Sequence, residues 1–246
     1  MAQAVQTPAP APLPTLEQSF ELLKGYKSAD DPTVLIPIDQ AVMGVHGNAA
    51  ARAALEQRLA SYLGASYSSV ARSFACRELA IIGSAASVPG LAPLLLDVEL
   101  SVFARQALER IPGPEADNAL RDAIAKSKGR TRIGIINSVA VRRDSRSIPL
   151  LVKAATDEPE MTAAAAKALG EIGTTESAKA LEAFRGKGTP AQRLAVADAF
   201  LICAERFIAS GERAQAVKLL EPLTDSSQPA HVRLAANRAL SAAARV

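Results

Sequence analysis

Residues 168–181 read ALGEIGTTESAKAL, and three upstream stretches align with them without a gap. These stretches are ELAIIGSAASVPGL from Glu78, ALERIPGPEADNAL from Ala107 and SVAVRRDSRSIPLL from Ser138, with starts 29, 31 and 30 residues apart. Each copy has leucine or valine at its second position and leucine at its last position. Four ungapped copies with the same apolar columns predict a tandem array, because a unit of about 30 residues buries its apolar face only against neighbouring units.

Each unit is predicted to contain a helix, a tight turn and a second helix. Apolar side chains before the turn, such as Phe74, Leu79 and Ile82, recur at the spacing that places them on one helical face. Residue types that end one helix or cap the next occupy two turn columns. These columns hold Gly83, Pro112, Arg143 and Gly173, followed by Ser84, Gly113, Asp144 and Thr174. The sequence therefore predicts an all-α protein, a right-handed α-solenoid of about five helix pairs with irregular helical caps.

The composition agrees with this fold and excludes several classes of protein. The chain is 49% hydrophobic but only 4% aromatic, which suits closely packed helices with small aliphatic side chains. A net charge of +3 is too small an excess for a typical nucleic-acid binder. Two Cys exclude a disulfide-dense scaffold and a four-cysteine zinc site, and two His leave too few ligands for a histidine-built metal centre. No stretch reaches about 18 consecutive apolar residues, so we expect no membrane span.

The pattern divides the chain into three segments. Residues 1–14 contain four prolines and are predicted to form a disordered Pro/Ala-rich linker. Residues 15–67 are predicted to form an N-terminal helical cap, and residues 68–246 the repeat array. The N-terminus lacks the charged start and apolar core of a signal peptide. It fits either a cytoplasmic tail or the start of a mature exported protein, and its composition slightly favours a periplasmic or exported location.

The repeated segments resemble HEAT repeats of the short bacterial kind, which are similar to the repeats of phycobilin lyases. More narrowly, CRELAIIGSAASVPGLAPLL, ARQALERIPGPEADNALRDAI, INSVAVRRDSRSIP and CAERFIASGERAQAV together resemble HEAT domains of exported bacterial multidomain proteins. The resemblance covers roughly residues 68–245. It implies a binding or spacer array, with no catalytic residue to carry over. Such domains often precede a sugar-binding or cytochrome c-type module, and none is expected within these 246 residues.

No catalytic or metal-binding motif is present in the sequence. The chain has no phosphate-binding glycine loop, no nucleophile elbow and no zinc-binding HExxH. Cys76 and Cys203 lie in equivalent helices among alanine and large apolar residues, which favours small buried side chains over reactive thiols. His46 and His231 are far apart in the repeat layout, so we expect neither to be a metal ligand. The prediction is a non-enzymatic protein with no catalytic residue, no metal and no cofactor.

One column of polar residues accompanies the repeats, two positions before the first core leucine of each copy. Equivalent positions of stacked repeats form a ladder along one surface, which we expect to be concave. These side chains either hydrogen-bond between repeats beside the core, the interpretation that we favour, or form a ligand-binding stripe on the concave face. The column, called the polar column below, consists of Arg77, Gln106, Asn137, Lys167, Asp198 and Arg238.

Basic residues concentrate around the turn of the third copy, at Lys126, Lys128, Arg130, Arg132, Arg142, Arg143 and Arg146. Arg142 stands in a column that holds isoleucine in the other copies, and such departures occur at functional or specially paired sites. We favour a structural pairing, in which Arg142 or Arg143 contacts Asp144 or a carboxylate of the neighbouring repeat such as Glu171. The alternative is that Arg142 and Arg143 bind an anion or an acidic partner. Asp144 is in the N-cap column and is expected to be a structural cap.

These observations favour a non-catalytic module that binds or scaffolds another protein on the concave face of a HEAT solenoid. The basic cluster suggests an acidic partner, whose identity the sequence does not give. One alternative is a HEAT-like protein that binds nucleic acid or another polyanion, against which stand the low net charge and the lack of aromatic residues among the basic ones. The other is an enzyme or chaperone similar to phycobilin lyases, for which no residue offers a nucleophile or an acid.

Overall fold

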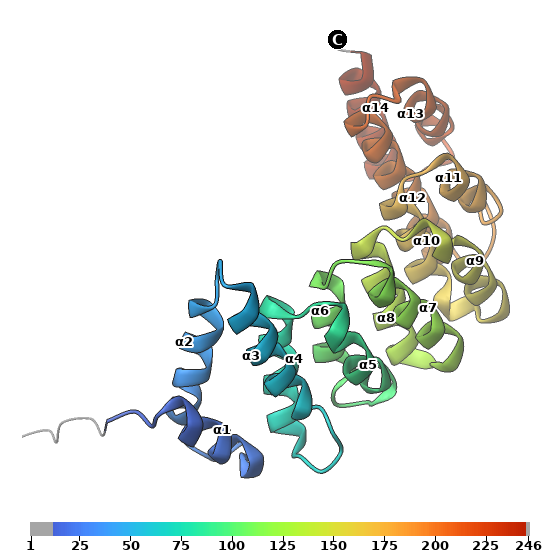
Figure 1. Ribbon diagram of the computed structural model, residues 1–246. Coiled ribbons are helices and arrows are strands. Elements are labelled where there is room, and N and C mark those ends of the chain that lie inside the picture. The colour runs from blue at the N-terminus through green and yellow to red at the C-terminus, as the bar shows by residue number, and fades with distance from the viewer. Residues whose placement is uncertain (1–11, 245–246) are drawn as a thin grey trace, which may run out of the picture.

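The structure is a computed structural model that describes residues 12–244, and every regular element within this range is a helix. The expected linker at 1–14 therefore lies outside the described residues, apart from residues 12–14, which form no helix. The chain alternates between two rows of helices, which stack into a bent array (Figure 1). The all-α solenoid predicted from the repeats is confirmed.

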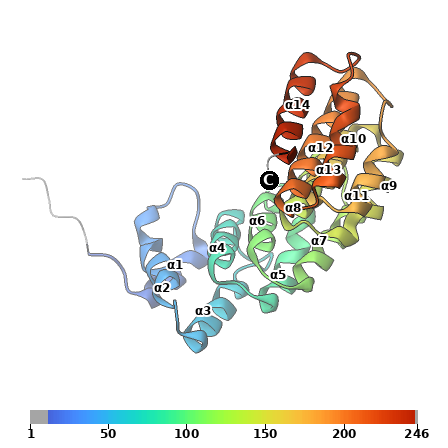
Figure 2. The same cartoon turned by 90° about the horizontal axis from the view of Figure 1, so that it is seen from above.

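The inner row lies on the inner side of the bend, and each of its helices packs against the next (Figures 1 and 2). Its most closely packed neighbours are α10 and α12. The inner row comprises α2 (Ile36–Gly44), α4 (Ser69–Ile82), α6 (Ser101–Arg110), α8 (Gly129–Arg142), α10 (Thr162–Ile172), α12 (Pro190–Ala209) and α14 (Ala230–Ala244).

The outer row covers the opposite side of the inner row. It comprises α1 (Leu16–Gly25), α3 (Ala49–Ser61), α5 (Val88–Leu91), α7 (Pro114–Lys126), α9 (Ile148–Asp157), α11 (Thr175–Glu182) and α13 (Arg213–Leu220). Short 3₁₀ helices begin or end several of these elements, namely η1 (Pro32–Leu35), η2 (Ala85–Ser87), η3 (Ala92–Leu96), η4 (Ser145–Ser147), η5 (Pro159–Met161) and η6 (Glu221–Thr224). Helix α5 is short because Pro93 has no backbone N–H to continue the α-helical ladder, and the chain proceeds as η3.

The two apolar columns of the repeat form the core of the array. Their eight side chains are completely buried, and they come alternately from inner and outer helices. Burial of this kind is the main stabilising contribution in a solenoid, because each helix pair covers the apolar face of the next. The columns are Leu79, Leu108, Val139 and Leu169 on the inner helices, and Leu91, Leu120, Leu151 and Leu181 on the outer side.

The N-terminal helices follow the same alternation as the repeats. Thr15 begins α1 with a capping box, in which its hydroxyl accepts from the Gln18 backbone and the Gln18 side chain accepts from Thr15. Helix α2 packs against α4, and α3 packs against α4 as an outer partner. The expected boundary between residues 67 and 68 therefore falls between two helices in contact. No helix within residues 12–244 is long and apolar enough to cross a lipid bilayer.

Candidate interaction surface

The polar column lies on the inner row, with one residue on each of six consecutive inner helices. Five of its side chains are exposed and Asn137 is half-buried. Within residues 12–244 none of the six forms a side-chain hydrogen bond or an ion pair. The favoured interpretation, a hydrogen-bond ladder between repeats, is therefore wrong. The side chains are exposed to solvent instead, apart from the half-buried Asn137.

Polar contacts between α6 and α8 come instead from residues that we did not single out in the sequence. Arg105 donates from Nη1 to the backbone oxygen of Gly134 at 3.1 Å, and the Ser138 hydroxyl donates to Glu109 Oε1 at 2.6 Å. Arg105 lies directly against Gly134, where a Cβ atom would be 2.8 Å from its Cζ atom. A polar Ser138 in a column otherwise occupied by Glu78 and alanine was the available signal.

A hollow of about 440 Å³ lies on the inner face between α4 and α6. We call it the arginine hollow, because Arg77 and Arg110 both line it. Both guanidiniums are exposed, and neither has an ion-pair partner among the described residues. The Arg77 guanidinium lies over the Phe74 ring, with 5.6 Å between Cζ and the ring centroid. The residues that line the hollow are Arg77, Ala80, Ile81, Gln106, Glu109 and Arg110.

A second hollow, also of about 440 Å³, lies on the other side of Ile81, between α2 and the start of α3. Ile81 and Met43 are exposed in it by 51% and 69%, which is unusual for large apolar side chains in a folded array. Ile81 lines both hollows, so an apolar surface continues from the second hollow into the arginine hollow. His46 also lines the second hollow, far from His231 on α14.

A buried carboxylate lies behind Arg77. The Glu78 side chain is almost completely buried on α4, and it has no hydrogen-bond partner among the described residues. Burial, followed by the nearby charge of Asp39 on α2, raises the pKa of Glu78 to about 7, and Arg77 opposes this shift. Burial also raises the pKa of Asp39, and Arg77 again opposes the shift. The charge behind Arg77 therefore changes near neutral pH.

Arg142 has the structural role that we favoured from the sequence, and its carboxylate partner belongs to a neighbouring helix pair. Its Nη1 atom donates to the backbone oxygens of Leu108 at 2.7 Å and Ile111 at 2.6 Å, and its Nη2 atom donates to Gly113 at 2.9 Å. Its Nε atom pairs with Asp117 at the start of α7. The expected pairing with a carboxylate of a neighbouring repeat is therefore confirmed, but the carboxylate is Asp117 and neither Asp144 nor Glu171, because Arg142 points back toward the end of α6.

Asp144 is a cap, as its position in the repeat predicts. It accepts from the Arg146 backbone at 3.2 Å and from the Ser147 hydroxyl at 2.6 Å, and it pairs with Arg121 of α7. Arg143 is exposed in a left-handed conformation, with φ 53°, and donates weakly to the Ile172 backbone oxygen at 3.4 Å. Glu171, for its part, pairs with Arg206 of α12.

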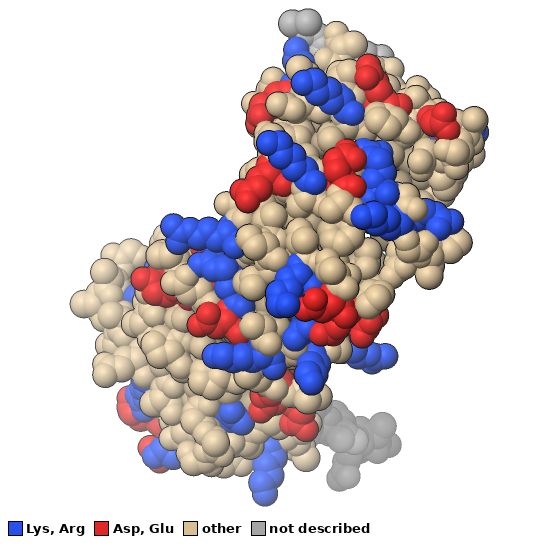
Figure 3. All heavy atoms as spheres, turned by 90° about the vertical axis from the view of Figure 1, so that its right-hand side faces the viewer, with Lys and Arg blue, Asp and Glu red and all other residues tan. Residues whose placement is uncertain are grey.

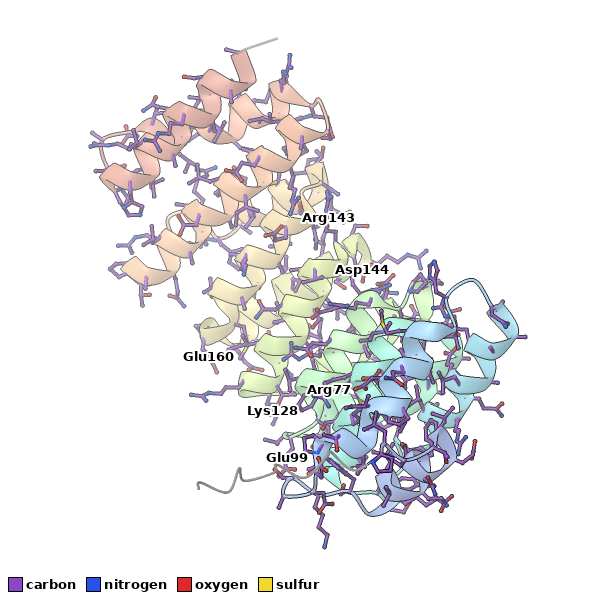
Figure 4. All side chains as sticks on the ribbon, turned by 90° about the vertical axis from the view of Figure 1, so that its left-hand side faces the viewer. Arg77, Glu99, Lys128, Arg143, Asp144 and Glu160 are labelled. Atoms are coloured by element: carbon purple, nitrogen blue, oxygen red, sulfur yellow. The ribbon has the colours of Figure 1, made fainter. Side chains whose placement is uncertain are left out.

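The structure thus separates two groups of predicted site residues. In Figure 4, Arg143 and Asp144 lie at one edge of the array, away from Arg77, which projects from the inner row. Three arginines of the expected basic cluster make internal contacts, Arg132 with Glu158, Arg142 with Asp117 and Arg143 with the Ile172 backbone. On the outer side, Lys and Arg alternate with Asp and Glu, so this face presents no continuous basic surface (Figure 3).

The cysteines are buried and carry no disulfide. Burial raises the pKa of the Cys76 thiol to about 12 and that of Cys203 to about 11, which disfavours the nucleophilic thiolate. Nowhere in residues 12–244 do three His, Cys, Asp or Glu side chains come together as they would around a metal ion. The described residues thus offer surfaces for binding, and we find no assembled catalytic group among them.

The fold and its exposed inner face define an α-solenoid with a candidate binding surface. Residues 118–201 match the family model for HEAT repeats. HEAT repeats generally mediate protein interactions or scaffolding and are typically non-enzymatic. A solved structure titled as the crystal structure of an engineered protein is 21% identical, covers 92% of this chain and 96% of its own, and superposes with a TM-score of 0.31. No curated protein matches this chain.

Proposed function

We propose that this protein is a non-catalytic binding module that holds a segment of another protein along its inner face. The observation that carries this proposal is the polar column, whose six side chains lie on six consecutive inner helices without a hydrogen bond or ion pair among the described residues. Polar side chains without such a partner remain available for hydrogen bonds to a ligand. Stacked repeats place them in one line, which suits an extended or helical segment.

Exposed apolar side chains on the inner helices support binding of protein rather than of a polyanion. Val141 on α8 and Leu234 on α14 are exposed by 63% and 52%, in addition to Ile81 and Met43. Protein interfaces combine apolar contacts with polar ones, whereas sites for nucleic acid rely on dense positive charge. Asp198 in the polar column would repel phosphates. The enzyme and chaperone alternatives gain no support from the described residues.

A peptide selection tests this function. Random twelve-residue peptides would be selected by display on the immobilised full chain, and bound peptides would be measured against variants of the two faces. The inner-face variant is Asn137→Ala with Lys167→Ala, and the matched outer-face control is Lys153→Ala with Lys179→Ala. We expect the inner-face variant to lose about tenfold in affinity while the control binds as wild type. Peptides that bind equally to both variants and to the wild type would contradict the proposal.

A further inference from the structure

The residues that line the arginine hollow carry one more positive than negative charge. Arg77 and Arg110 both line it, and its one acidic lining residue is Glu109, which accepts a hydrogen bond from Ser138. Two guanidiniums that share a hollow repel each other, and this repulsion is relieved when an anion lies between them. Asp39 and Glu78 lie behind Arg77 and do not line the hollow.

The geometry of the two arginines suits recognition of a carboxylate. Phe74 supports the Arg77 guanidinium from below, which limits the side-chain freedom that binding must otherwise remove. Guanidiniums bind carboxylates through parallel N–H donors, and such charge-assisted hydrogen bonds are stronger than neutral ones. Gln106, which also lines the hollow, can donate an additional amide hydrogen bond.

Neighbouring apolar surface indicates that the carboxylate belongs to a polypeptide. Exposed Ile81 lines the arginine hollow and also lines the second hollow, where Met43 is exposed. Val141 is exposed on α8, the inner helix that follows the helix of Arg110. A free anion would leave these side chains in water, whereas aliphatic residues beside an Asp or Glu would cover them. The two arginines of the hollow therefore lie on inner helices that also expose apolar side chains.

We propose that the arginine hollow binds an aspartate or glutamate side chain of a partner protein, within a segment whose adjacent aliphatic residues cover Ile81 and Met43. This inference rests on the proposed function, since it assigns part of the partner's chemistry to one place on the inner face. It differs from the acidic-partner site expected at Arg142 and Arg143, which lie in turns at the edge of the array.

The test uses the same peptide selection on the full chain, with a charge-reversed variant that carries Arg77→Glu and Arg110→Glu. Both residues are exposed and make no hydrogen bond among the described residues, so we expect the variant to fold, with a lower melting temperature at neutral pH because Arg77→Glu adds a carboxylate near Asp39 and Glu78. Selected peptides should contain Asp or Glu beside aliphatic residues and bind the variant at least about tenfold more weakly. Replacing the acidic residue of the peptide by its amide should cause a similar loss.

The outcomes separate the inference from the function on which it rests. If peptides bind the charge-reversed variant normally but lose affinity for Asn137→Ala with Lys167→Ala, the inner face binds protein and the carboxylate site is overturned. If neither variant affects binding, both proposals fail. A peptide in which phosphoserine replaces the acidic residue and binds more than about tenfold tighter would assign the hollow to phosphorylated segments, and would also overturn the carboxylate site.

Discussion

The Arg142 guanidinium closes the end of the preceding inner helix, because its Nη1 atom donates to the backbone oxygen of Ile111 at 2.6 Å. Ile111 is also the residue whose column Arg142 shares in the aligned repeats. Helix ends leave backbone carbonyls without intrahelical partners, and the arginine supplies donors to those of Leu108, Glu109 and Ile111. It also donates to Gly113 and pairs with Asp117. One substitution in the repeat consensus thus joins two neighbouring repeats.

The first prediction concerns this residue. Arg142→Ile restores the consensus but leaves Asp117 and the α6 carbonyls without their donor, so we expect it to destabilise the protein by about 2–4 kcal/mol. Chemical denaturation followed by circular dichroism measures the change. Arg146→Ile is the control, because that side chain is exposed four residues away and has no ion-pair partner among residues 12–244. An Arg142→Ile protein as stable as wild type would show that the network contributes nothing.

Asp144 both caps a helix and pairs with Arg121, and two substitutions separate these roles. Asp144→Ala removes the cap on Arg146 and leaves Arg121 without its carboxylate, for an expected loss of about 2–3 kcal/mol. Asp144→Asn retains a capping oxygen and removes the charge, so its loss should be smaller. The two unfolding free energies measured side by side give the contribution of the cap. Equal losses would mean that the ion pair alone accounts for the effect.

Arg143 is the one non-glycine residue with positive φ in the described part of the chain. Its conformation, φ 53°, resembles that of the equivalent Gly173, φ 64°. A left-handed conformation costs a non-glycine residue about 1 kcal/mol, so Arg143→Gly should be neutral or stabilising by up to about 1 kcal/mol. Arg143→Val should destabilise, because β-branched residues tolerate this conformation poorly. A clear loss of stability in Arg143→Gly would mean that its hydrogen bond to Ile172 outweighs the strain.

Gly170 permits the close contact between α10 and α12. A Cβ atom at this position would lie 2.5 Å from the backbone oxygen of Ala199, so the two helices would have to separate. We expect Gly170→Ala to destabilise by about 2–3 kcal/mol. Gly44→Ala is a suitable comparison, since nothing lies within 4 Å of a Cβ atom there. Melting temperatures of the two variants test the prediction, which fails if both equal the wild type.

Glu78 should make stability depend on pH. Its pKa is about 7 in the folded protein against an ordinary value of 4.5, so the folded state binds the additional proton. The stabilising effect is present below about pH 4.5 and is lost as the pH rises through about 7, and it amounts to roughly 3 kcal/mol. Asp39 contributes in the same direction. In Glu78→Gln the melting temperature should vary less between pH 5 and 8, the range over which most of this effect is lost. A profile unchanged by the substitution would contradict the raised pKa.

Much of the architecture could be predicted from the sequence because each repeat has the same local pattern of apolar and capping residues. The columns of Leu79 and Leu91 identify the buried faces of inner and outer helices, and both prove completely buried. Asp144 is recognisable as a cap because capping depends on residues within one turn. The polar column was likewise assigned to one surface, since equivalent positions in stacked repeats must align.

The partners of individual side chains depended on tertiary structure. Arg142 contacts residues about 30 positions upstream, and nothing in its neighbourhood in the sequence distinguishes Asp117 from Asp144 as its partner. Arg77 and Arg110 approach the same hollow only because α4 and α6 pack side by side. The pKa of Glu78 is near neutrality because tertiary packing buries its carboxyl and brings Asp39 of α2 close to it. The sequence by itself determined the helical repeat, its core and its caps, which are properties of local periodicity. Only the packing of repeats decided which polar side chains form internal hydrogen bonds or ion pairs and which remain exposed, because these bonds join residues one repeat apart.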